Sequence, residues 1–186
     1  MSADTQAASY ILEQRMMPSL VSKLRLAMIA GALFVAAMAF IFPLLTGDND
    51  PLVSGVFLGV AVLDLGLAVA LPSVLTRSPP LTRYALYAAR LDIVQGNPAA
   101  ASARVLASIP YAQITGVEDA ADTLAEKDRA AGFAAIALIF REHQPALAVM
   151  PYYDRKSPPR LILRGLKNDE NPYARIKDMV EKNKSS

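Results

Sequence analysis

The 186-residue sequence contains no cysteine and no tryptophan, and its single histidine is His143. Without cysteine the chain can form neither a disulfide bond nor a thiolate metal site, so nothing in it requires an oxidising compartment. No segment follows the GxxxxGK[S/T] pattern of a phosphate-binding loop. These absences exclude cysteine-containing zinc sites and P-loop nucleotide hydrolysis.

Charged residues are almost missing from two long apolar runs in the first half of the chain. Residues 26–45 carry no charge, and residues 52–75 carry only Asp64. A helix of about 20 residues crosses the ~30 Å hydrocarbon core of a bilayer. The first run begins too late and is too long for a cleaved signal peptide, and a second run follows it. We therefore predict a transmembrane hairpin formed by residues 26–45 and 52–75.

Positive charge is absent from the loop between the two runs, which holds Asp48 and Asp50. Lysine and arginine flank the hairpin instead, at Lys23, Arg25, Arg77, Arg83 and Arg90. Because loops rich in these two residues stay on the cytoplasmic side, both termini are expected in the cytoplasm.

Asp64 stands near the middle of the second run, where an aspartate costs about 2.5–3.5 kcal/mol on insertion scales. Three explanations remain open. The carboxyl group is protonated and donates to a backbone carbonyl within the hairpin, it contacts a polar group of another chain, or it belongs to a proton or ion relay. A relay normally needs several polar residues in line, and the hairpin sequence has no second one.

The same run carries Gly55, Gly59 and Gly66 on one helical face, opposite Asp64. Small residues let another helix approach closely. Ala27, Gly31 and Ala32 of the first run are small as well, so one face of the second run is expected to meet the first run, and the other face is left for something else. Asp64 and the three glycines are thus candidate residues for binding a partner inside the membrane.

The segments outside the hairpin differ in character. Residues 1–25 have irregular helical spacing of apolar residues, which favours a short amphipathic helix at the membrane surface or an unstructured tail. Residues 76–186 begin with a Pro-Pro linker and continue as short strand patterns. We expect two strands within 83–94, one over 109–116, a hairpin over 132–153 and a strand over 160–165. A last helix is expected to start with Asn171 as N-cap and Pro172 in its first position.

The segment "IPYAQITGVE" (Ile109–Glu118) and this order of strands before a final helix resemble the bacterial pleckstrin-homology-like domains, over roughly residues 82–183. The resemblance implies a membrane-anchored α+β protein of the bacterial inner membrane, in which the hairpin precedes a small β-barrel or roll with a C-terminal capping helix. It also implies partner binding or membrane-surface scaffolding, since the family has no shared catalytic residues, and it transfers no site residue. Residues 118–132 are longer and more acidic than a plain strand connection, which leaves a helical insertion there as an open alternative.

Other polar residues give weak signals for chemistry. His143 lies in a Glu-His-Gln-Pro turn without a second ligand or nucleophile that the sequence places near it. Asp119, Asp122 and Glu126 share one helical face but lack EF-hand spacing. Both groups are expected to be solvated, and we expect no catalytic residue, metal or cofactor.

Basic residues cluster near the end of the chain, within a segment that also holds Tyr152 and Tyr153. The cluster consists of Arg155, Lys156, Arg160, Arg164 and Lys167. It is either a solvated face or a contact for anionic lipid or an acidic partner, while a membrane tether argues against nucleic acid.

The sequence therefore predicts a non-enzymatic accessory protein that docks onto, assembles or stabilises a larger membrane complex, as one subunit of a hetero-oligomer. The alternative is a sensor of anionic lipid. A membrane enzyme or small transporter fits poorly, because two spans with one ionisable residue make a poor pathway.

Overall fold

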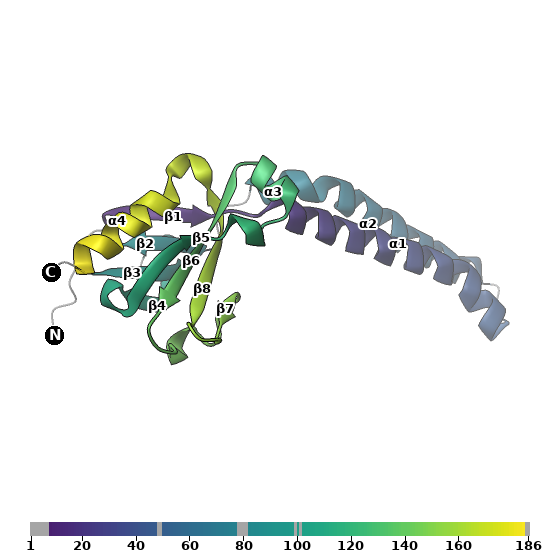
Figure 1. Ribbon diagram of the computed structural model, residues 1–186. Helices are drawn as coiled ribbons and strands as arrows, with labels where there is room; N and C mark the ends of the chain where they lie inside the picture. Colours follow the sequence, from purple (N-terminus) through teal and green to yellow (C-terminus); the bar gives the residue numbers. More distant parts are fainter. Residues whose placement is uncertain (1–7, 48–49, 78–81, 99, 101, 185–186) are drawn as a thin grey trace. The chain divides into compact units, whose positions relative to one another are not determined.

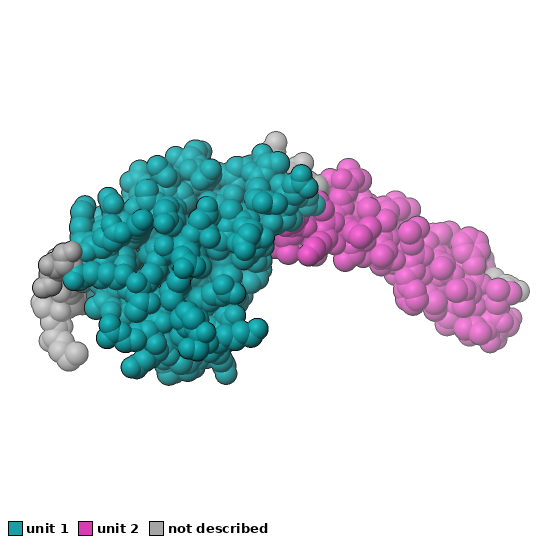
Figure 2. All heavy atoms as spheres, in the orientation of Figure 1, with its two compact units in different colours: residues 1–17, 79–186 teal, residues 18–78 magenta. Residues whose placement is uncertain are grey.

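The computed structural model describes residues 8–47, 50–77, 82–98, 100 and 102–184. The chain forms two compact units, one of residues 18–78 and one of residues 1–17 together with 79–186 (Figures 1 and 2). We call them the hairpin unit and the sheet unit. The hairpin unit lies between two segments of the sheet unit in the sequence, so the sheet unit is discontinuous.

The hairpin unit consists of helices α1 (Pro18–Thr46) and α2 (Pro51–Arg77). Their mean hydropathies reach 2.4 and 2.3, and both helices are long and apolar enough to cross a membrane. The two predicted runs are confirmed as helices, and each helix extends beyond its run. Large apolar side chains such as Leu44 and Leu52 are exposed on the outside of the hairpin.

The sheet unit contains two antiparallel sheets (Figure 1). The first has the order β1-β2-β3-β4, and the second has the order β5-β6-β8-β7. The strands are β1 (Tyr10–Gln14), β2 (Thr82–Leu86), β3 (Arg90–Gln95), β4 (Arg104–Pro110), β5 (Ile114–Asp119), β6 (Phe133–Phe140), β7 (Tyr153–Asp154) and β8 (Arg160–Lys167). The predicted α+β class is confirmed, but the two sheets do not close into a barrel.

Helix α4 (Pro172–Lys184) packs on β5, β6 and the short 3₁₀ helix η1 (Tyr111–Gln113). Its Ile176 and Val180 are buried in a core that both sheets supply. The helix begins at Pro172 as predicted, whereas Asn171 adopts a left-handed conformation rather than the extended one of a typical N-cap. The Asn171 carbonyl still accepts a hydrogen bond from the N–H of Arg175, at 3.2 Å.

Strand β1 is the largest departure from the sequence-based expectation. The amphipathic helix or loose tail predicted for residues 1–25 is wrong for Tyr10–Gln14, which pair antiparallel with β2. Leu12 is fully buried in the core, and Glu13 forms an ion pair with its cross-strand neighbour Arg83 at 3.2 Å. The partner strand follows about 70 residues later, and this partner rather than the local sequence makes the segment a strand.

The N-terminal segment continues across the second sheet at Gly165. The N–H of Arg15 donates to the Gly165 carbonyl at 2.8 Å. Gly165 has φ +77°, and a Cβ there would come within 2.5 Å of the Arg15 carbonyl oxygen. This position therefore needs glycine for its backbone conformation and for the close approach of the two segments.

Two further expectations are resolved by the structure. Over 132–153, β6 forms as predicted, but the second apolar run is wrong as a strand. That run holds the 3₁₀ helix η3 (Pro145–Leu147) and turns, because Pro145 and Pro151 cannot donate to a strand ladder. Residues 118–132 hold the 3₁₀ helix η2 (Ala121–Thr123) and the five-residue helix α3 (Glu126–Ala130), which agrees with the helical alternative. A last 3₁₀ helix, η4 (Asn168–Glu170), precedes α4.

Candidate functional sites

The two helices of the hairpin unit contact each other through alanines spaced seven residues apart. Ala32 and Ala39 of α1 and Ala61 and Ala68 of α2 are all at most 4% exposed. Ser54 Oγ donates to the Ala39 carbonyl at 3.0 Å, and the rings of Phe42 and Phe57 lie 6.0 Å apart. Residues spaced seven apart lie on the same side of a helix, so the alanines of each helix face the other helix. Their small side chains let the two helix backbones approach closely.

The glycine face of α2, formed by Gly55, Gly59 and Gly66, points away from α1. All three glycines are exposed, and a Cβ built on any of them would meet nothing within 4 Å. The glycine face is therefore not the face that meets the first run, because the alanine stripe provides the small residues for that contact. Among the small residues named for the first run, Ala32 is buried, whereas Ala27 and Gly31 are exposed.

Asp64 lies on the α1-facing side of α2, half-buried between Ala61 and Ala68. It is opposite the glycine face, as the helical spacing predicts, but the hairpin interface and not the outer surface holds it. Within the described part of the chain its carboxylate has no hydrogen bond or ion pair. The backbone-carbonyl contact considered from the sequence is therefore not formed here, and a contact to another chain stays a prediction.

The basic cluster of the sheet unit is divided between internal contacts and solvent. Arg160 lies 3.7 Å from the Asp154 carboxylate. Arg164 donates to the Thr123 carbonyl at 2.8 Å, and Lys167 donates to the Ala131 carbonyl at 3.2 Å. Arg155 and Lys156 are exposed, and no ion pair of theirs is found among the described residues.

The sequence did not indicate these internal contacts because the acceptors belong to the segment of residues 118–132. That segment covers part of the outer face of the second sheet. Its Ala120 and Leu124 join Phe133, Ala135 and Ala137 in a small second core. Arg164 and Lys167 also lie over the rings of Tyr152 and Phe133, at 4.5 and 4.3 Å.

The weak chemical candidates occupy ordinary surface positions. His143 Nδ1 lies 3.0 Å from the Tyr153 hydroxyl, which also accepts the N–H of Gln144 at 2.7 Å. Asp119 accepts the N–H of Ala121 at 2.9 Å and so shapes a turn. Among the residues that the structure describes, no three His, Cys, Asp or Glu side chains are grouped in a way that could hold a metal ion.

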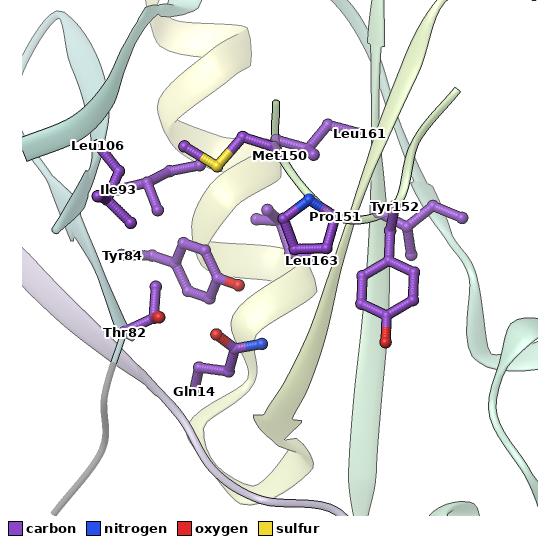
Figure 3. A pocket seen from close by; sticks show the side chains of 11 residues that line it. Gln14, Thr82, Tyr84, Ile93, Leu106, Met150, Pro151, Tyr152, Leu161 and Leu163 are labelled. Carbon is purple, nitrogen blue, oxygen red and sulfur yellow. The ribbon is translucent and has the colours of Figure 1, made fainter. Parts of the chain in front are cut away.

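A cavity of about 140 Å³ opens between the two sheets (Figure 3). Its polar wall consists of Gln14 from β1 and of Thr82 and Tyr84 from β2. The apolar wall includes Ile93, Leu106, Met150, Pro151, Leu161 and Leu163. Tyr152 lies at the border with φ +65°, which is an unusual conformation for a bulky residue.

The Tyr84 hydroxyl points into this cavity (Figure 3). Tyr84 is only 4% exposed, yet its hydroxyl has no hydrogen bond to any residue that the structure describes. Burial raises the pKa of Tyr84 above its ordinary value, with a smaller contribution from Tyr152, so the hydroxyl stays neutral and able to donate. Sequence reasoning missed the cavity because five strands and a turn build it. Strand β1 was not predicted, and the strand predicted over 109–116 is wrong as one element, since η1 separates the end of β4 from β5 there.

Comparison with protein-family models, curated proteins and solved structures finds no match to this chain.

Proposed function

We propose that the protein is a non-enzymatic accessory subunit, anchored in the bacterial inner membrane by the hairpin unit and docked onto a larger membrane complex. Both termini and the sheet unit face the cytoplasm. The partner is another membrane protein, and its helix packs on the glycine face of α2. The observation that carries the proposal is that this face stays open while the hairpin packs through its opposite side.

The glycine face needs an explanation of this kind because glycine is a poor helix former. Each glycine costs a helix interior about 1 kcal/mol relative to alanine. In a bilayer, helices gain no hydrophobic energy from each other, and small residues that let backbones meet become the main determinant of association. The hairpin itself gains no such contact from Gly55, Gly59 and Gly66. We therefore infer that a helix of the partner packs against them.

The order of elements in the sheet unit supports a pleckstrin-homology-like domain as the cytoplasmic part. A four-stranded antiparallel sheet precedes a second antiparallel sheet, and helix α4 closes the core with Ile176 and Val180. The order of strands before a final helix is the part of the resemblance over residues 82–183 that supports this proposal, although the two sheets are not closed into a barrel. Such a domain supplies a second surface for the complex without contributing catalysis.

The test is purification of the tagged full-length chain from native membranes in mild detergent, with partners identified by mass spectrometry. Gly59→Leu fills the glycine face, and Gly31→Leu is the matched control, since Gly31 is equally open but lies on α1. We expect a stoichiometric membrane partner with the wild type and with the control, and its loss with Gly59→Leu. A wild-type protein that purifies alone and monomeric would contradict the proposal.

Asp64→Leu, in the same experiment, separates the two candidate intramembrane contacts. Because Asp64 faces α1, we expect the partner to remain bound. Release of the partner by this change alone would instead make Asp64, and not the glycine face, the main contact to the complex.

A sensor of anionic lipid is the second candidate, and one surface favours it. Val149 is 86% exposed and Tyr152 is 49% exposed, and the exposed Arg155 and Lys156 follow within the same loop region. An apolar and aromatic tip beside free basic residues suits a membrane surface, where each basic residue contributes about 1 kcal/mol. Vesicle binding of the sheet unit that ignores anionic lipid content and salt would contradict this role.

A further inference from the structure

We propose that the cavity between the two sheets binds an uncharged amphiphile from the bilayer, a lipid that carries a hydroxyl or ester group beside its apolar chain. The inference rests on the proposed insertion of the hairpin into a membrane. It assigns a ligand site to the sheet unit that is distinct from the glycine face and borders the basic cluster at Tyr152, over whose ring Arg164 lies.

The polar wall of the cavity has hydrogen-bonding capacity that the protein does not use. Within the described chain, the side-chain amide of Gln14 and the hydroxyls of Thr82 and Tyr84 have no hydrogen-bond partner. Gln14 and Thr82 are directly paired across β1 and β2, and Tyr84 follows two residues along β2. Three polar groups thus converge on one wall (Figure 3), where the polar part of a ligand can replace the solvent as their hydrogen-bond partner.

The remaining wall and the size of the cavity define the apolar part of the ligand. Ile93, Leu106, Met150 and Leu163 line the space above the polar wall. A volume of about 140 Å³ is close to the ~150 Å³ of an engineered apolar cavity that binds benzene. The cavity therefore has room for a ring-sized group or a short length of acyl chain.

The charge of the lining selects an uncharged ligand. Gln14, Thr82, Tyr84 and Tyr152 are its polar side chains, and none of its lining residues is Asp, Glu, Lys, Arg or His. A carboxylate or ammonium group entering such a site would lose hydration without a counter-charge, which is far more costly than burying a hydroxyl or an ester.

The bilayer is the source of the ligand because of where the polar wall sits in the chain. Gln14 is four residues before Pro18, where α1 begins, and Thr82 is five residues after Arg77, where α2 ends. Both residues are thus only a few positions along the chain from a helix that we propose to span the membrane, so bilayer lipid is the ligand class that the proposal commits to.

The test uses the full-length chain reconstituted in bilayer nanodiscs that contain a diacylglycerol with a photoreactive group on its chain. A fatty acid with the same photoreactive chain is the charged comparison. After illumination, adducts are mapped to residues by mass spectrometry. Lipid-facing residues of α1 and α2 serve as an internal control, because any membrane-inserted hairpin is labelled there.

We expect the diacylglycerol probe to label residues of the cavity, such as Met150 and Leu163, in addition to the hairpin. Tyr84→Phe removes only the hydroxyl that points into the cavity, and it should weaken cavity labelling about two- to tenfold, as for one lost hydrogen bond. Its thermal stability should be unchanged. Leu106→Phe, which fills the cavity, should abolish cavity labelling while hairpin labelling persists.

Tyr111→Phe is the matched control. The Tyr111 hydroxyl is buried without a hydrogen bond in the part of the chain that the structure describes, and Tyr111 does not line the cavity. Hairpin labelling without cavity labelling, equal labelling by the fatty acid, or an equal loss in Tyr111→Phe would overturn the site. Absence of labelling on the hairpin would overturn membrane insertion itself, and the two failures are thereby distinguished.

Discussion

The hairpin unit and the sheet unit place the same kinds of residue in opposite positions. In the hairpin, leucines such as Leu44 and Leu45 are 84% and 77% exposed, and the buried positions are mostly alanines. In the sheet unit, Leu12, Leu138 and Leu166 are fully buried. Hydrophobicity therefore explains the packing of the sheet unit, whereas in the hairpin the size and spacing of small residues determine which faces meet.

The comparison extends to how each unit is encoded in the chain. Both helices of the hairpin are adjacent in sequence and meet through a short loop. The sheet unit instead takes β1 from before the hairpin and all its other strands from after it. The hairpin is thus an insertion between two paired strands, and the sheet unit should tolerate its removal but not the loss of β1.

The largest expected effect on the stability of the sheet unit comes from the loss of β1, which the hairpin separates from the other strands in the sequence. Joining residue 17 to residue 81 by a short Gly/Ser linker should give a sheet unit that unfolds cooperatively, because β1 and β2 are already antiparallel neighbours. The fragment 78–186 lacks β1 and should be unfolded or molten. Truncating one buried leucine such as Leu12 already costs about 2–5 kcal/mol, out of a typical total of 5–15 kcal/mol.

Circular dichroism with thermal melting and amide hydrogen exchange measures this difference. The linked chain also provides the soluble sheet unit that the vesicle-binding test needs. Cooperative melting of the fragment 78–186 at the same temperature as the linked chain would mean that β1 is dispensable.

The sequence predicted the elements whose signals are local, and it missed the contacts that are not. The apolar runs gave both helices, and β2, β3, β8 and the start of α4 followed from alternation and from Pro172. Strand β1 was missed because its pairing partner is distant and its five residues carry no clear period. The sequence left open which side of α2 meets α1, because two stripes of small residues, one of glycine and one of alanine, suit a helix contact equally well.

The candidate sites show the same difference between local signals, which the sequence reveals, and contacts between distant segments, which it does not. The spacing of Asp64 and Gly55 correctly put them on opposite faces of one helix, but which face was buried depended on the other helix. The basic cluster was visible in sequence, whereas the carbonyls of Thr123 and Ala131 that bind two of its members were not. The inter-sheet cavity had no local signal, since its polar wall joins Gln14 to residues that follow the hairpin.

The next largest effect on stability is expected at Gly165, where the N-terminal segment crosses the second sheet. Gly165→Ala should destabilise the sheet unit by more than the ~1–2 kcal/mol of a left-handed backbone alone, because the new Cβ also meets the Arg15 carbonyl. Gly132→Ala is the control, since Gly132 has φ +74° and open space around its Cβ position. Urea unfolding of the linked chain compares the two, and equal losses would indicate that the Arg15 contact is not formed.

Within the hairpin, the comparison predicts sensitivity at small residues on one side only. Ala61→Leu should disturb the α1–α2 contact, since overpacking typically costs about 1–3 kcal/mol. Gly59→Leu should leave that contact intact, because its side chain points into open space. The chain has no native cysteine, so cross-linking of cysteines placed at Ala39 and Ser54 reports the contact specifically. Equal cross-linking in both variants would place the contact elsewhere on α2.

The smallest effect is a pH dependence that belongs to the sheet unit alone. All seven tyrosines lie outside residues 18–78, and tryptophan is absent, so tyrosinate absorbance reports this unit without interference. Burial raises the pKa of Tyr84 and of Tyr111 above the ordinary value of 10.0, and Tyr111 is also raised by Asp92. The folded state therefore holds both protons after the unfolded state has released them.

Stability from these two groups is fully present below about pH 10 and falls as the pH rises, by at most about 1.4 kcal/mol per pH unit for each group. Unfolding of the linked chain between pH 9 and 11 should accordingly be less pH-dependent in the Tyr84→Phe, Tyr111→Phe double variant than in the wild type. In the folded wild type, tyrosinate absorbance near pH 10.5 should match that of the double variant, because neither buried hydroxyl has ionised. A larger wild-type signal would mean that water reaches one of them, and comparison of the single variants would identify whether it enters through the cavity at Tyr84 or through the core at Tyr111.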